Sequence, residues 1–309
     1  MAVKKVILAE PRGFCAGVEM AIDTVERALK KYGPPLYVFH EIVHNRYVVE
    51  DFARRGVTFV QSVDEVPAGA RLIFSAHGIS PEVWKKAGEK RLQLLVDATC
   101  PLVDKVHREV RKFAGRGYWI ILVGHVGHDE ILGTYGEAPE RIRVVGNVEE
   151  ARRVSVPDPE KVAVLTQTTL SVDDTREIIE ALRERFPGIV TPPKEDICYA
   201  TQNRQDAVKA LAKEVDLVLV IGSKNSENSN QLCRVARSQG IPAYLVNDMS
   251  EVEPQWLVEV ERLGITSGAS VPERLVQEAA DYFALHGAQV AQLSLVEENV
   301  HFALPAEVA

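Results

Sequence analysis

The sequence predicts an α/β protein made of three pseudo-equivalent small α/β domains with largely parallel sheets. Apolar runs typical of strands alternate with helical patterns along the chain, as in parallel sheets covered by helices. Cys15, Cys100 and Cys198 each lie between strand-like or turn-like residues and a helical pattern. At similar distances beyond each cysteine, a further apolar run ends in polar residues. The chain therefore reads as a threefold repeat.

The first module begins with a strand at residues 6–9, which are all apolar. After Cys15, apolar residues recur at helical spacing over residues 18–29, and two lysines and Gly33 close that helix. A second strand is expected at residues 36–39. A later strand is followed by His77 and then by Ser80, which has the character of a helix N-cap.

The other two modules repeat this order. A strand at 94–96 precedes Cys100, a helical pattern covers 103–113, and a strand follows at 118–123. Residues 196–197 precede Cys198, a helical pattern covers 207–212, and a strand follows at 217–221. Aligning Ser171 with Ser80 of the first module places Thr168 opposite His77. In the third module, the corresponding strand-to-helix segment is residues 265–273, which include Ser270.

Module length follows from the cysteine spacing. Length alone indicates about two domains, but the three cysteines recur 85 and 98 residues apart. We expect modules at 1–97, 98–195 and 196–285, followed by a C-terminal tail at 286–309. Ligands of open α/β sheets bind outside the carboxyl ends of the strands. Three equivalent modules are thus expected to bring their cysteines together at one centre.

The cysteine pattern indicates a catalytic metal site. The chain has four cysteines and no C-x-x-C motif. A single cysteine in such a turn is ordinarily a small buried hydrophobic residue, but three at corresponding positions indicate a shared centre. Three thiolates hold zinc with an open position, or an iron–sulfur cluster with one iron lacking a protein ligand. The spacing does not choose between them. Cys233 has no counterpart in the other modules and is predicted to pack within a helix.

Histidines and helix N-termini at the strand ends predict an anion site. Five of the eight histidines lie at strand ends: His40, His44, His77, His125 and His128. Ser226, Asn228 and Ser270 lie at predicted helix N-termini, where N–H groups and the helix dipole favour phosphate. Glycine-rich phosphate-binding motifs are absent.

Glu130 is the carboxylate that stands out. It lies two residues after His128 in the same polar cluster. A nearby polyanion would repel its charge and so help it keep a proton at neutral pH. Glu130 is therefore our candidate general acid.

Composition excludes several classes. Thirty-six Lys and Arg against 44 Asp and Glu give a net charge of −8, which argues against binding to nucleic acid or acidic membranes. No apolar stretch approaches the ~18 residues of a membrane span, and the run at 6–9 is too short for a signal peptide. We expect a cytoplasmic protein with cysteines present as thiols or metal ligands.

Eight motifs carry a family resemblance: RGFCAGV (12–18), VHN (43–45), SAHG (75–78), DATCP (97–101), GHDE (127–130), TQTTLS (166–171), ICYAT (197–201) and GSKNS (222–226). With them the chain resembles the 4-hydroxy-3-methylbut-2-enyl diphosphate reductase (LytB/IspH) family over about residues 6–285. The resemblance implies a trefoil of three domains around a central 4Fe–4S cluster with three Cys ligands and one open iron. It implies the last step of the non-mevalonate isoprenoid pathway. Two electrons and two protons remove the allylic hydroxyl of the substrate, giving isopentenyl diphosphate, dimethylallyl diphosphate and water.

The resemblance also implies roles and partners. Cys15, Cys100 and Cys198 would bind the cluster, and Glu130 would donate the proton. The implied substrate-binding residues are His44, His77, His128, Thr168, Ser226, Asn228 and Ser270. The partners would be an allylic diphosphate and an external electron donor of ferredoxin or flavodoxin type. The family often has serine where this chain has Glu227, so we expect only the backbone of Glu227 to face the ligand.

Two other classes remain open. A zinc-dependent phosphohydrolase would use the same three cysteines with Glu130 as a base. A non-catalytic metal-binding scaffold is the third possibility. The colour of the protein purified without oxygen separates the reductase from a zinc protein, because iron–sulfur clusters are brown and zinc is colourless.

Overall fold

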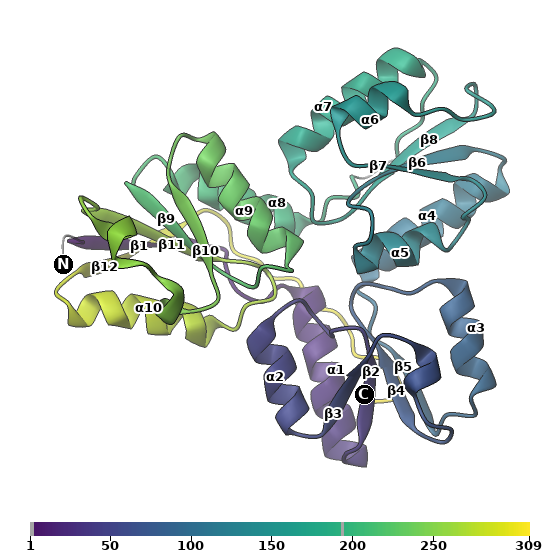
Figure 1. The fold of residues 1–309 in the computed structure, drawn as a ribbon, viewed down its shortest axis with the longest axis horizontal. Helices are drawn as coiled ribbons and strands as arrows, with labels where there is room; N and C mark the ends of the chain where they lie inside the picture. The colour runs from purple at the N-terminus through teal and green to yellow at the C-terminus, as the bar shows by residue number, and fades with distance from the viewer. Residues whose placement is uncertain (1–2, 193–194) are drawn as a thin grey trace. The chain divides into compact units, whose positions relative to one another are not determined.

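The computed structural model describes residues 3–192 and 195–309, in which strands and helices alternate as predicted (Figure 1). The named strands of these residues form three sheets, and all their pairings are parallel. This confirms the predicted α/β class with three small sheets. The chain divides into two compact units, Met1–Ala16, His44–Val48 and Tyr199–Val300 in the first, and Gly17–Val43, Val49–Cys198 and His301–Ala309 in the second.

The first unit contains one five-stranded sheet. Its order is β10 (Ala243–Val246), β9 (Leu217–Ile221), β11 (Arg262–Ser267), β1 (Lys5–Glu10) and β12 (Gln289–Ser294). Helix α10 (Glu273–Leu285) covers one face, and α8 (Tyr199–Leu211) and α9 (Glu227–Ser238) cover the other. Short 3-10 helices occupy Met249–Glu251 and Pro254–Leu257.

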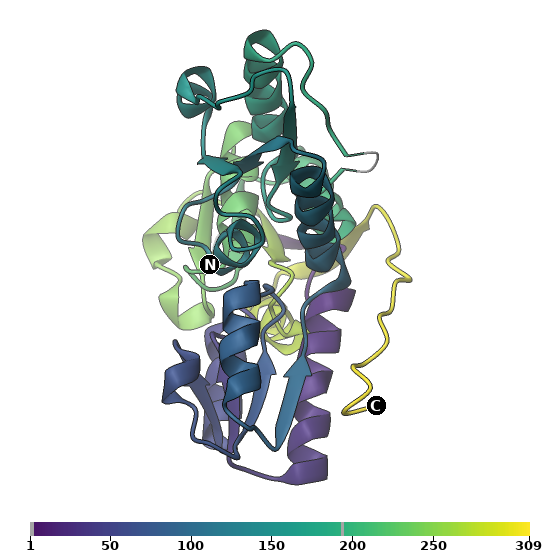
Figure 2. The same cartoon turned by 90° about the vertical axis from the view of Figure 1, so that its right-hand side faces the viewer.

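The second unit contains two sheets. One has the order β3 (Val57–Val60), β2 (Leu36–Phe39), β4 (Arg71–Phe74) and β5 (Leu94–Asp97). Helix α3 (Pro81–Glu89) packs on it, and Figures 1 and 2 show α1 (Ala16–Tyr32) running along the same sheet. A 3-10 helix at Val63–Glu65 has a capping box. Helix α2 (Arg46–Arg54) belongs partly to each unit.

The other sheet of the second unit has the order β7 (Ile142–Val145), β6 (Trp119–Val123) and β8 (Val162–Thr166). Helices α4 (Pro101–Gly115) and α5 (Asp129–Tyr135) pack on one face. Helices α6 (Val148–Arg153) and α7 (Val172–Arg185) pack on the other. Buried apolar side chains on both faces explain the continuous apolar runs of these strands.

Three segments differ from the predicted modules. Strand β1, assigned to the first module, pairs with β11 and β12, because its residues are buried alternately on both faces and require a central position. The predicted tail contributes β12 to that sheet. Among the described residues between α7 and Cys198 there is no named strand, although Val190 forms an isolated bridge with Ala163. The junctions at 98 and 196 stay predictions.

Candidate active site

The three repeated cysteines lie where the chain enters a long helix. Cys15 lies between β1 and α1, Cys100 is the N-cap residue of α4, and Cys198 directly precedes α8. None of the three is in a disulfide, and all three are half-buried. The positive end of a helix dipole favours a thiolate, and equally any negative group that the thiolate holds.

The residues around these thiols fit an iron–sulfur cofactor. A methyl group on Gly17 would lie 2.5 Å from Cys100 Sγ, so only glycine leaves the space beside this sulfur clear. Three cysteine thiols at helix N-termini, none of them in a disulfide, are a soft donor set that suits iron–sulfur clusters or zinc. The donor chemistry alone therefore accommodates either metal group.

Cys233 differs from the other three cysteines. It is 4% exposed and packs among apolar side chains of α8, α9 and β9. Burial raises the pKa of its thiol to about 11. A thiol that stays protonated at neutral pH is a poor ligand, so the prediction that Cys233 packs within a helix is confirmed.

In the first unit, hydrogen bonds link the Cys15 turn to several predicted substrate residues. The backbone N–H of Cys15 donates to Ala269 O at 3.2 Å, and Ala269 N–H donates to Asn228 Oδ1 at 3.0 Å. The hydroxyl of Ser270 donates to His44 O at 3.0 Å. The ends of β1 and β11 and the starts of α2 and α9 thus meet at one place.

Ser226 is the N-cap residue of α9, as the sequence predicts. Its Oγ accepts a hydrogen bond from Ser229 N–H at 3.4 Å. Ser229 fits between Gly222 and Gly268, where added methyl groups would lie 2.3 Å and 2.1 Å from Ser229 Oγ. The two glycines let the ends of β9 and β11 approach the first turn of α9.

The carboxylate of Glu227 forms an ion pair with Arg234 of the same helix. The pair holds the side chain along the helix surface. The expectation that only the backbone of Glu227 faces a ligand stays a prediction.

In the second unit, Glu130 is a buried carboxyl group paired with Thr168. Its Oε1 accepts from Thr168 N–H at 2.7 Å, and its Oε2 accepts from Thr168 Oγ1 at 2.9 Å. Burial raises the pKa of Glu130 from 4.5 to about 7, although both Thr168 hydrogen bonds lower it. Glu130 therefore exchanges a proton near neutral pH, as a general acid requires.

The predicted residues of the second unit also lie together. Cys198 N–H donates to Thr168 O at 3.1 Å, next to the Glu130 pair. The rings of His77 and His128 are perpendicular, with centroids 6.0 Å apart. His128 is the N-cap residue of α5, and its Nδ1 accepts from Glu130 N–H at 3.2 Å. Accepting at Nδ1 places the proton of a neutral His128 on Nε2.

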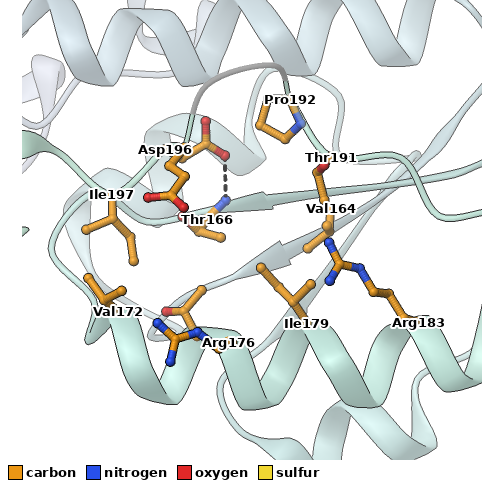
Figure 3. Close-up of a pocket in the computed structure, with 12 residues that line it drawn as sticks. Val164, Thr166, Val172, Arg176, Ile179, Arg183, Thr191, Pro192, Asp196 and Ile197 are labelled. Atoms are coloured by element: carbon orange, nitrogen blue, oxygen red, sulfur yellow. Dashed lines mark hydrogen bonds between the residues drawn. The ribbon is translucent and has the colours of Figure 1, made fainter.

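The side chain of Asp196 connects the segment before Cys198 to the end of β8 and to α4. Asp196 Oδ2 accepts from Thr166 N–H at 3.0 Å, and Oδ1 pairs with Lys105 at 2.9 Å. Figure 3 shows this hydrogen bond at the edge of a cavity of about 250 Å³ beside β8 and α7. The cavity is mainly apolar, with Arg176 and Arg183 among its lining residues. None of the predicted site residues lines it, so it is not the candidate site.

Sequence reasoning missed two polar contacts of this region. Thr201 Oγ1 accepts from Asn228 Nδ2 at 3.4 Å, and Gln167 Oε1 accepts from His125 N–H at 3.1 Å. Gln167 lies next to Thr168 in the TQTTLS motif, and Thr201 lies three residues after Cys198 in the ICYAT motif. Their position in those motifs was the available signal.

Among residues 3–192 and 195–309, no helix is both long and apolar enough to cross a bilayer.

Known proteins resemble this chain over almost its full length. The family described as LytB protein matches residues 6–284. The 4-hydroxy-3-methylbut-2-enyl diphosphate reductases of Mycolicibacterium vanbaalenii and Mycobacterium leprae are 54% and 53% identical, each over 99% of this chain and over 91% and 92% of their own lengths. A solved structure of the E-1-hydroxy-2-methyl-but-2-enyl-4-diphosphate reductase from Plasmodium falciparum is 40% identical. It aligns with a TM-score of 0.95 over 99% of this chain and 97% of its own.

The parallel sheets define an α/β protein, which has thiols at helix N-termini and a buried carboxyl group, Glu130, whose pKa is raised to about 7. The three relatives described above are all named as reductases. The chain belongs to the LytB family, a family of iron–sulfur reductases of isoprenoid biosynthesis.

Proposed function

We propose that the chain reduces (E)-4-hydroxy-3-methylbut-2-enyl diphosphate to isopentenyl diphosphate and dimethylallyl diphosphate. Two electrons and two protons replace the allylic C–O bond by a C–H bond and release water. The observation that carries the proposal is the buried pair of Glu130 and Thr168, hydrogen-bonded beside Cys198. An acid with a pKa of about 7 is matched to the loss of hydroxyl as water at neutral pH.

Cys15, Cys100 and Cys198 would hold a 4Fe–4S cluster with one iron free of protein ligands. When bound, such a cluster supplies electrons and an open, Lewis-acidic iron position. The electrons would come from an external donor of ferredoxin or flavodoxin type. Cysteines without disulfides at all three positions suit the reducing cytoplasm, where we propose that the protein works.

Glu130 would supply a proton to the departing oxygen. Thr168 is the weaker candidate for the acid, because a hydroxyl cannot give up a net proton cheaply. Its Oγ1 donates to Glu130 Oε2 in the structure. It would therefore orient the acid or relay a proton.

The diphosphate would be held by histidine, serine, threonine and asparagine side chains and by helix N-termini, without a lysine cluster. The proposed substrate residues are His44, His77, His128, Thr168, Ser226, Asn228 and Ser270. Ser226 opens α9, a helix of 12 residues whose N-terminal dipole favours an anion.

Single replacements of His44, His77 or Asn228 by alanine should raise the Michaelis constant. Each lost charge-assisted hydrogen bond should cost about 1.5–3 kcal/mol, or roughly ten- to a hundredfold in binding. Steady-state kinetics with the cluster spectrum as a loading check would measure this. His286→Ala is the matched control, because His286 is an exposed histidine bonded to Tyr282 O. Unchanged diphosphate affinity in all three variants would remove the basis for this set of donors.

Anaerobic purification tests the cofactor. A broad brown absorbance with matching iron and sulfide is expected. A colourless zinc protein would overturn the reductase and favour the phosphohydrolase, which has no support among the relatives described above.

A further inference from the structure

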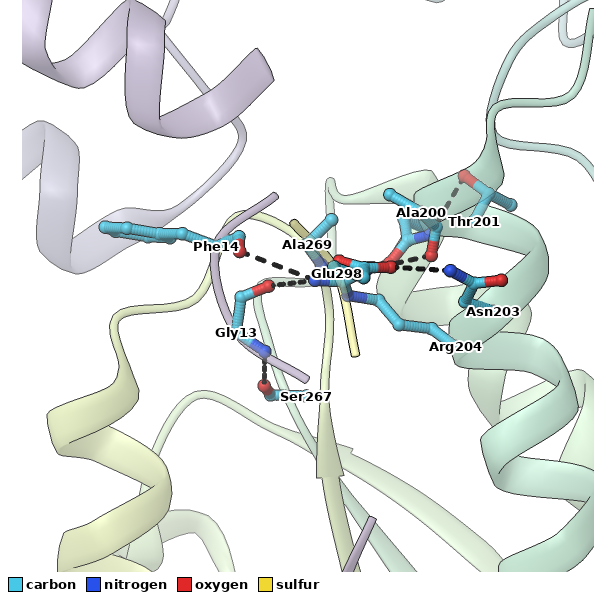
Figure 4. A network of polar contacts seen from close by, with 10 residues as sticks. Gly13, Phe14, Ala200, Thr201, Asn203, Arg204, Ser267, Ala269 and Glu298 are labelled. Atoms are coloured by element: carbon cyan, nitrogen blue, oxygen red, sulfur yellow. Dashed lines mark hydrogen bonds and ion pairs between the residues drawn. The ribbon is translucent and has the colours of Figure 1, made fainter. Parts of the chain in front are cut away.

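Arg204 is a buried arginine that holds the turn before Cys15. Its side chain is fully buried on α8, the helix that begins directly after Cys198. Its Nη2 donates to Gly13 O at 2.8 Å and to Phe14 O at 3.5 Å (Figure 4). These two carbonyls belong to the residues immediately before Cys15.

The charge of Arg204 is matched by a carboxylate beyond β12. Its Nη1 lies 3.1 Å from both carboxylate oxygens of Glu298, and Asn203 Nδ2 donates to Glu298 Oε1 at 3.0 Å. The Arg204 side chain is 0% exposed and that of Glu298 is 14% exposed. A guanidinium buried without a carboxylate would carry a large desolvation penalty. Glu298 therefore makes this position possible for arginine.

The other side of the turn is held by β11 and the loop after it. Gly13 N–H donates to Ser267 Oγ at 2.8 Å, and Cys15 N–H donates to Ala269 O at 3.2 Å. Gly13 has a φ of +68°, which favours glycine. The donors of the turn thus face β11 and the loop that follows it, and two of its acceptors face Arg204.

A neutral amide could have satisfied the same carbonyls. Arginine instead places a permanent charge there, and buried ion pairs add little net stability compared with apolar packing. The choice of arginine is therefore better explained by geometry and electrostatics at Cys15 than by stability.

We propose that Arg204 is a positioning residue for Cys15, and that Glu298 sets the net charge beside this ligand. The proposal rests on the proposed function, in which Cys15 binds the cluster. It makes the segment after β12 a supporting part of the cluster site. Positive charge near a cluster favours its reduced form, and negative charge opposes it.

Charge-changing variants of the holoenzyme give the sharpest test. In a redox titration of the bound cluster followed by electron paramagnetic resonance, Arg204→Met should lower the reduction potential and Glu298→Gln should raise it. Arg204→Lys should stay near the native potential. The control is Arg262→Met, which removes an exposed ion pair of 2.9 Å with Asp216 at the opposite end of the sheet and should leave the potential unchanged.

Hydrogen exchange supplies a readout that needs no cluster. In Arg204→Met, the peptide at residues 11–17 should exchange at least about tenfold faster, because charged hydrogen bonds to the turn are lost. Strand β9 should keep its native exchange rate. If the substitution destabilised the whole unit, exchange in β9 would accelerate as well.

Potentials that move in the same direction in Arg204→Met and Glu298→Gln, or in neither, would overturn the proposal. Equal acceleration at β9 and at residues 11–17 would do the same. If Arg204→Met does not fold, the same measurements on Arg204→Lys and Glu298→Gln test the proposal. If the native protein takes up no cluster, the proposed function is wrong, and exchange at residues 11–17 alone decides the role of Arg204.

Discussion

Replacing Cys15, Cys100 or Cys198 by serine should abolish the cluster absorbance and reduce turnover to background. Each of these cysteines is outside any disulfide, half-buried and placed at the start of a long helix. A serine hydroxyl ionises far less readily than a thiol and is a harder donor, so it does not replace thiolate toward iron. The measurement is the anaerobic absorbance spectrum with iron and sulfide content, followed by the rate of substrate reduction.

Cys233→Ser is the matched control within the same chain. Cys233 is buried in α9 with the pKa of its thiol raised to about 11. Its replacement should cost some stability through a buried hydroxyl but leave colour and turnover intact. A folded Cys233→Ser protein without a cluster would contradict the threefold assignment of the ligands.

The repeat was visible in the sequence because strand-to-helix junctions have a strong local signature. Apolar runs, helical spacing and N-cap residues are local properties of the chain. Ser80, Ser171 and Ser226 are N-cap residues in the structure as the sequence predicts. For the same reason the cysteines were correctly expected at the starts of three helices.

The membership of the sheets was not visible in the same way. The pattern of β1 indicates a buried strand, but any sheet covered on both faces could accept it. It pairs with β11, more than 250 residues later, in the register Lys5↔Arg262. The pairing depends on long-range packing, which no local window contains.

The burial of two charged residues was also beyond local reasoning. Arg204 lies in a polar stretch of α8 that looks like a solvated helix face, yet it is fully buried because Glu298 and the Gly13 carbonyl meet it there. Glu130 was chosen for its motif. Its raised pKa comes from burial beside Thr168, which is 38 residues away in sequence.

Glu130→Gln should keep the cluster and bind substrate nearly normally, while turnover falls about 10²- to 10⁴-fold, the usual contribution of a positioned acid. Glutamine keeps the size of the side chain and can still accept the hydrogen bond from Thr168 N–H. It cannot supply the proton that turns the leaving hydroxyl into water. Thr168→Val should lose less, because the threonine hydroxyl is not the acid. Single-turnover reduction of the substrate by the reduced enzyme measures the step directly.

The pH dependence separates this role from a structural one. Because turnover needs protonated Glu130 and its pKa is about 7, native turnover should be level below pH 7 and fall above it, by about tenfold per pH unit. Turnover of Glu130→Gln should lack this decrease above pH 7.

The stability of the protein should depend on pH through the same group. The pKa of Glu130 in the folded state is raised above the ordinary 4.5, so the folded state binds more protons than the unfolded state between the two values. Native stability therefore decreases as pH rises through this range. The variant should therefore be at least as stable as the native protein at pH 8, as thermal unfolding would measure. If Glu130→Gln instead reduces substrate at close to the native rate with the same pH profile, the proton comes from water or from the diphosphate.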